Sequence, residues 1–165
     1  MTAARRTATC AIMAALCVVL MLLGAVLELG LYAAPMLAGL LLSLAGKQFG
    51  RRYQLMLWVA VSILCFLLVP NLEENLLFAG FLGWYPALWP TLQKCPKLPR
   101  LLLKLLLFNA CLVAIEVPLM LLFFPEDLGT GMLILLLLLA NITFWLYDRL
   151  IPLFEHLLRR IFNRR

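Results

Sequence analysis

The sequence predicts an all-α polytopic membrane protein with six short transmembrane helices, both chain ends in the cytoplasm, and a C-terminal amphipathic helix. Of its 165 residues, 65% are hydrophobic and only 13% are charged, and the mean hydropathy is +1.04. A soluble domain typically has about a quarter of its residues charged. The apolar residues are therefore too many for one buried core, and we expect membrane lipids to solvate the excess.

Six apolar runs have lengths that suit the hydrocarbon core, which a helix of about 17–25 residues crosses. Polar residues, glycines and prolines separate the runs, which cover residues 7–27, 29–45, 53–69, 76–92, 101–124 and 130–151. The first boundary is the weakest, because only Glu28 and Gly30 interrupt the stretch 7–45. A tight helical hairpin is predicted there, and a re-entrant second segment is the alternative.

The charged residues orient these helices. With six alternating spans, all 14 lysines and arginines fall on one side, and Glu28, Glu73, Glu74, Glu126 and Asp127 fall on the other. Insertion keeps positive charge in the cytoplasm, so the basic side is predicted to be cytoplasmic. The net charge of +6 lies in short clusters between apolar runs and not on one polar face, which argues against nucleic acid as a partner.

Residues 1–151 are interpreted as one transmembrane domain and residues 152–165 as a basic surface helix. Apolar side chains recur in this tail at helical spacing, opposite a polar and basic face. They are Leu153, Phe154, Leu157, Leu158, Ile161 and Phe162. Such a helix typically lies among lipid headgroups, where each basic residue gains about 1 kcal/mol near anionic lipid. Docking to a cytoplasmic partner is the alternative.

Glu116 is the clearest ionisable residue at membrane depth, about eight residues or roughly 12 Å from the outer end of the fifth span. Two residues later, Pro118 leaves the carbonyl of Ala114 without its helical donor. Together they predict a polar notch that suits a cationic or hydrogen-bonding ligand entering from outside. A protonated glutamate that bonds a neighbouring helix is an alternative of nearly equal weight.

Asn109 and Asn141 are predicted to lie at similar depth, because the fifth and sixth spans are antiparallel. Asn109 precedes Glu116 by seven residues and so lies on nearly the same helix face. We expect the two amides to bond each other between the helices, with a place in a ligand site as the alternative. Asp148, beside Arg149 at the cytoplasmic exit, is interpreted as half of a surface pair.

The fourth span is rich in aromatic residues and glycines, including Phe81, Trp84 and Trp89. Such rings can form the wall of a site for an apolar or aromatic ligand. Aromatic residues near a membrane interface are also ordinary anchors, and Trp89 is interpreted as one. The outward loop 71–75 is predicted either to gate the pocket or to be a solvated cap.

Ala11 and Ala15 are spaced four residues apart on a face of small residues in the first span. Faces of this kind permit close contact between helices. Packing within the chain is the default expectation, and contact with a second protein is the alternative.

Catalytic chemistry is not expected. The sequence has no G-x-S-x-G, H-E-x-x-H or G-x-x-x-x-G-K motif. Its five cysteines form no C-x-x-C pair, and His156 is the only histidine, so ligands for a zinc or haem site are scarce. We therefore expect a protein that is not an enzyme and has neither a metal nor another cofactor.

Three stretches carry a resemblance to a known family: Thr9-Cys-Ala-Ile-Met-Ala-Ala15, Gly46-Lys-Gln-Phe-Gly-Arg-Arg52 and Phe81-Leu-Gly-Trp-Tyr-Pro86. With six short helices and both ends cytoplasmic, the chain resembles the substrate-binding S components of energy-coupling factor (ECF) vitamin transporters. The resemblance implies a multi-pass protein of the bacterial plasma membrane that binds a small molecule near the outer surface. It also implies that Glu116, Asn109, Trp84 and Asn141 line the binding site.

The same resemblance implies protein partners. In that family an Ala-x-x-x-Ala motif on the first helix contacts a transmembrane coupling subunit, and Ala11 and Ala15 match its spacing. Two cytoplasmic ATPases would supply the energy. A non-catalytic membrane scaffold is the alternative, because the six-helix fold also serves that purpose. A stand-alone secondary transporter is less favoured, since the sequence has no internal repeat.

Overall fold

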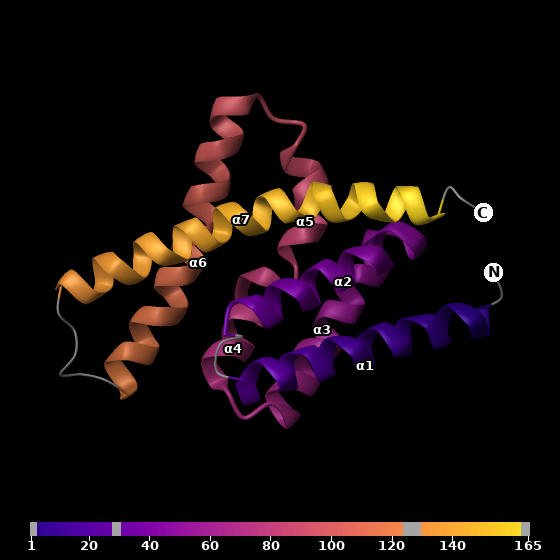
Figure 1. The fold of residues 1–165 in the computed structure, drawn as a ribbon, viewed down its shortest axis with the longest axis horizontal. Coiled ribbons are helices and arrows are strands. Elements are labelled where there is room, and N and C mark those ends of the chain that lie inside the picture. The colour runs from indigo at the N-terminus through magenta and orange to yellow at the C-terminus, as the bar shows by residue number, and fades with distance from the viewer. Residues whose placement is uncertain (1–2, 28–30, 124–129, 163–165) are drawn as a thin grey trace.

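The computed structural model describes residues 3–27, 31–123 and 130–162, and every element in these ranges is helical (Figure 1). The predicted all-α class is confirmed. The predictions made for Glu28, Glu126 and Asp127 lie outside the described residues, as do those for the side chains of Leu158, Ile161 and Phe162.

Within the described ranges, four helices are long and apolar enough to cross a membrane, as expected of a membrane protein. They are α1 (Ala3–Leu27), α3 (Arg51–Leu68), α6 (Lys97–Phe123) and α7 (Thr130–Phe162). The predicted second span corresponds to α2 (Ala33–Phe49), which has 17 residues. The predicted fourth span, residues 76–92, contains the end of α4 (Leu72–Leu77), the π-helix η1 (Phe78–Leu82) and α5 (Tyr85–Leu92). The count of six spans stays a prediction.

The π-helix shifts the backbone hydrogen bonds of the fourth segment. The Gly83 N–H donates to the carbonyl of Phe78, five residues earlier, at 2.9 Å. Two nearby carbonyls accept from side chains instead: Gly80 from Trp84 Nε1 and Leu82 from the Tyr147 hydroxyl, each at 2.8 Å. Single π turns of this kind recur at functional sites. Here the turn ties the fourth segment to α7.

Gly50 makes the sharp connection between α2 and α3. Its φ of +96° lies in a region that side chains rarely allow, so glycine suits this position. Its N–H donates to the carbonyl of Gly46 at 2.9 Å and closes the end of α2. The next helix therefore starts at Arg51 and returns beside α2.

Two buried clusters form the interior. The first core joins α1, α2 and α3, and it consists of Met13, Cys17, Val18, Met21, Ala38, Leu42, Ala45, Leu57, Val61, Cys65, Val69 and Phe78. The second core lies among α2, η1, α5, α6 and α7, and it consists of Met36, Leu40, Leu77, Phe81, Leu82, Tyr85, Leu92, Phe108, Leu112, Ala140, Phe144, Tyr147 and Ile151. Residues of α2 and η1 contribute to both clusters, so these two elements connect them.

In Figure 1 the start of α1 and the end of α7 lie at the same side of the molecule, and their other ends lie at the opposite side. α7 continues as one helix through Pro152 to Phe162, so the tail is helical and extends the sixth predicted span. Leu153 and Leu157 are exposed there, while Phe154 packs against the second core.

Candidate functional site

A cavity of about 500 Å³ lies between the end of α1, the start of α4 and the half of α6 that follows Glu116. That volume is in the range of small-molecule sites, about 300–1,000 Å³. Its polar lining residues are Asn71, Glu73 and Glu116. Its apolar lining residues are Ala25, Pro70, Leu72, Leu119, Met120, Phe123 and, from α7, Leu136.

Glu116 is the buried carboxyl group of this cavity, with 5% of its surface exposed. The hydroxyl of Tyr32, which immediately precedes α2, donates to Glu116 Oε1 over a long 3.5 Å. Within the described ranges, the hydrogen bond to this carboxylate therefore comes from a neutral donor. Sequence reasoning did not identify Tyr32, and its separation of 84 residues from Glu116 explains why.

The start of α4 contributes the second carboxyl group of the cavity. Asn71 caps this helix, because its side-chain oxygen accepts from the Glu74 N–H at 3.2 Å. This local bond fixes the first turn and leaves Glu73 in the cavity wall. Partial burial raises the pKa of Glu73, which lies before the predicted fourth span. The segment 71–75 is thus mostly helical, and Asn71 and Glu73 of it line the cavity; a gating role for this segment stays a prediction.

Glu74 does not line the cavity but is fully buried beside it. Neither carboxylate oxygen has a hydrogen-bond partner among the described residues. Burial raises the pKa of Glu74 to about 7. The side chain lies against Gly24, where a methyl group would meet its carboxylate oxygen at 2.6 Å.

Asn109 and Asn141 bond each other, as predicted. Each amide nitrogen donates to the other side chain's oxygen at 2.9 Å, and each also donates to the backbone carbonyl four residues earlier. This pair connects α6 with α7 and does not line the cavity. A role of the two asparagines in ligand binding stays a prediction.

Trp84 is half-buried and lies away from the cavity wall. Its indole donates to Gly80, and its ring packs edge-on against Phe81 with centroids 5.7 Å apart. Of the four predicted ligand-binding residues, the structure therefore brings only Glu116 to the cavity, while Trp84 packs against the second core. The position of Trp84 leaves its predicted role in ligand binding untested.

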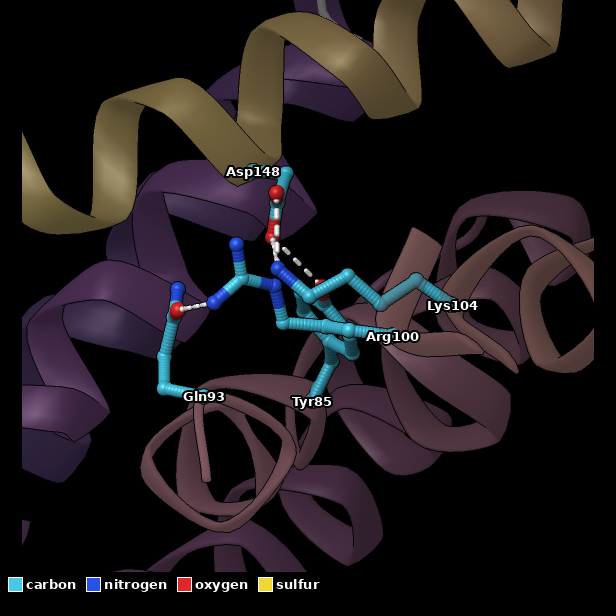
Figure 2. Close-up of polar contacts among 5 residues, drawn as sticks. All are labelled: Tyr85, Gln93, Arg100, Lys104 and Asp148. Carbon is cyan, nitrogen blue, oxygen red and sulfur yellow. Dashed lines mark hydrogen bonds and ion pairs between the residues drawn. The ribbon is translucent and has the colours of Figure 1, made fainter. Parts of the chain in front are cut away.

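A second polar site lies where α5, α6 and α7 meet (Figure 2). Lys104 Nζ contacts the two oxygens of Asp148 at 2.6 and 2.8 Å, and the Tyr85 hydroxyl donates to the same carboxylate at 2.6 Å. Lys104 is only 3% exposed, although sequence reasoning placed it in a cytoplasmic basic cluster. Arg100 and Gln93 form a further hydrogen bond beside this group.

The prediction that Asp148 forms a surface pair with Arg149 is wrong. Asp148 faces Lys104, and the Arg149 guanidinium instead lies 5.2 Å from the centre of the Trp145 ring. The reason is helical periodicity, because consecutive residues point about 100° apart. Asp148 follows Phe144 by four residues, so it shares the face that packs on α6.

Ala11 and Ala15 are both exposed on α1, whose buried face contains Met13, Cys17 and Met21. The default expectation of packing within the chain is therefore not met at these two positions. Their face of α1 is open to lipid or to another protein.

Comparisons of the chain with protein-family models, with curated proteins and with solved structures found no match. The functional argument therefore rests on the residues and geometry described above.

Proposed function

We propose that this chain is the membrane-embedded, substrate-binding subunit of an ECF-type uptake transporter for a small micronutrient. Separate ATPase subunits energise the transport, and the chain itself catalyses no reaction. It crosses the bacterial plasma membrane six times, with both ends in the cytoplasm, and the end of α4 forms the fourth span together with η1 and α5, so that Glu73 and Glu74 precede this span.

The cavity beside Glu116 is the observation that carries this proposal. It has the volume of a small-molecule site, and it places a buried carboxyl group among apolar side chains. A charged group at membrane depth is costly, so its position in a cavity favours a binding role. In the six-span topology this end of α6 is the outer end, which suits capture of a solute from outside.

Contacts between the basic ends of the helices support the topology. The guanidinium of Arg6 at the start of α1 lies 4.5 Å from the centre of the Tyr53 ring at the start of α3. Arg51 of α3 donates to the Thr91 hydroxyl near the end of α5 at 3.4 Å. These ends therefore lie side by side, as helices that begin or end at one membrane surface should.

The open face of α1 supports a coupling partner. Ala11 and Ala15 are exposed at a spacing that permits close contact with another helix. The same observation favours the alternative of a membrane scaffold, in which helix contacts are the whole function.

Native mass spectrometry after gentle detergent purification separates the two functions. A small molecule that co-purifies with the chain, or a coupling subunit with an ATPase pair, is expected for the transporter subunit. Recovery of another membrane protein, with neither a small molecule nor ATPases, would favour the scaffold.

Substitution of Glu116 by Gln tests the cavity directly. The variant should release the co-purifying molecule, because the charged group in the cavity wall is lost. Glu74→Gln is the matched control, since it removes a neighbouring carboxyl group that does not line the cavity. Full retention of the molecule by a folded Glu116→Gln variant would remove this residue from the site.

A further inference from the structure

The charged side chains described in the wall of the Glu116 cavity are both acidic. Glu116 comes from α6 and Glu73 from α4, and Asn71 is the other polar residue of the wall. Among the described residues, no lysine, arginine or histidine lines this cavity. The described donor to Glu116 is the neutral hydroxyl of Tyr32.

Only 5% of the surface of Glu116 is exposed, yet the hydrogen bonding of its carboxyl group is incomplete. Oε1 accepts one long bond from Tyr32, which is the hydrogen bond that the described residues give to this carboxyl group. A buried carboxylate is costly unless it is paired and hydrogen-bonded. A positively charged group would complete this carboxylate, and the described residues of the cavity wall do not supply one.

Neighbouring acidic side chains add to the uncompensated negative charge of Glu116. Glu73 lies close enough to Glu116 for the two carboxylates to repel each other, and the buried, unpartnered Glu74 is the next residue of α4. Repulsion is strong where the dielectric constant is low. A cation between Glu73 and Glu116 would turn the repulsion into two attractive contacts.

The remaining wall indicates an organic cation and not a metal ion. Leu119, Met120 and Phe123 of α6 present apolar surface, and methionine adapts to varied ligand shapes. A calcium ion takes about 6–8 oxygen ligands, whereas the described part of this wall offers only the polar side chains of Asn71, Glu73 and Glu116. Among the described residues, no group of three histidine, cysteine or acidic side chains is placed to hold a metal.

We propose that the ligand of this cavity is an organic cation with an apolar body, its positive group held between Glu116 and Glu73 and its body against Leu119, Met120 and Phe123. The inference rests on the proposed binding function of the cavity and specifies the chemical class of the ligand.

Three probes of similar shape test the class: 2-phenylethylammonium as the cation, 2-phenylethanol as the neutral form and 3-phenylpropionate as the anion. Each is titrated calorimetrically into the full chain in lipid nanodiscs at about pH 8, with empty nanodiscs as the blank. The cation should bind at least about tenfold more tightly than the alcohol, and the anion should bind least.

Substitutions and a change of pH test whether the two carboxylates cause the preference for the cation. Glu116→Gln and Glu73→Gln should each weaken cation binding about tenfold and leave the alcohol unchanged, while Glu74→Gln should have a smaller effect. Protons compete for the same carboxylates, so cation binding should weaken as the pH falls to about 5.

The outcomes separate the two proposals. Equal or tighter binding of the alcohol or the anion, or cation binding that is the same at both pH values, would overturn the cationic class and leave the binding function intact. Absence of binding by all three probes, together with no co-purifying small molecule, would overturn both.

Discussion

The helices α1, α2 and α3 pack closely along much of their length, whereas α6 and α7 meet chiefly through side chains at their crossing. The first core consists mainly of aliphatic and sulfur-containing side chains, and Gly24 lets α1 approach α2 at Ala34. The α6–α7 crossing instead combines the Lys104–Asp148 ion pair with the stacked rings of Phe108 and Phe144, whose centroids are 4.4 Å apart.

This difference shows two ways to hold helices together in lipid, where apolar surface alone gives little preference for another helix. Small residues allow backbones to approach, so dispersion is gained along the whole contact. Polar and aromatic pairs act over a wider gap and concentrate the attraction at a few points. Beyond the crossing, α6 and the start of α4 enclose the Glu116 cavity. The more widely spaced region therefore contains the candidate binding site.

The largest expected effect comes from breaking the polar crossing. Lys104→Met leaves the Asp148 carboxylate without its cation and should lower the free energy of unfolding by about 3 kcal/mol, the lower end of the range for buried pairs because Asp148 is partly exposed. Denaturant unfolding in detergent micelles measures this. Arg149→Met is the control and should cost less than about 1 kcal/mol. Equal losses in the two variants would contradict a structural role for the ion pair.

The close approach of α1 and α2 is tested by adding one methyl group. In Gly24→Ala the new Cβ would collide with the Cβ of Ala34 and crowd Glu74, so stability should fall by about 1–3 kcal/mol. Gly131→Ala is the matched control, because its Cβ would meet nothing within 4 Å. Thermal unfolding of both variants gives the comparison, and a neutral Gly24→Ala would show that the two helices separate at little cost.

Glu74 should make stability depend on pH. Burial raises its pKa from 4.5 to about 7, so folding favours the protonated carboxyl. Its stabilising contribution is complete below pH 4.5 and is lost as the pH rises through about 7. The melting temperature should therefore fall over this range in the natural protein and fall less in Glu74→Gln. The same slope in both proteins would assign the pH dependence to another group.

The smallest effect is expected for the amide pair. Asn109→Leu and Asn141→Leu each remove one partner, and a double-mutant cycle should give a coupling of about 0.6 kcal/mol, as is typical of hydrogen bonds between membrane helices. Unfolding of the two single variants and the double variant supplies the cycle. Additive losses would mean that the asparagines stabilise the crossing independently.

Local features of the site were predictable, and its assembly was not. The isolated Glu116 and the following Pro118 predicted a polar notch in an apolar run, and antiparallel helices predicted the Asn109–Asn141 bond. Tyr32 and Glu73 reach the same cavity from distant parts of the chain. Spacing along one helix contains no information about such neighbours.

The sequence alone determined the all-helical class and the apolar lengths suited to a membrane, because hydrophobic runs and helical periodicity are local properties. Only the tertiary structure decided that Asp148 pairs with Lys104 and not with Arg149, that Ala11 and Ala15 stay exposed, and that the fourth segment contains a π-helix. These outcomes depend on how each helix is rotated about its axis. That rotation is set by packing against several neighbours at once.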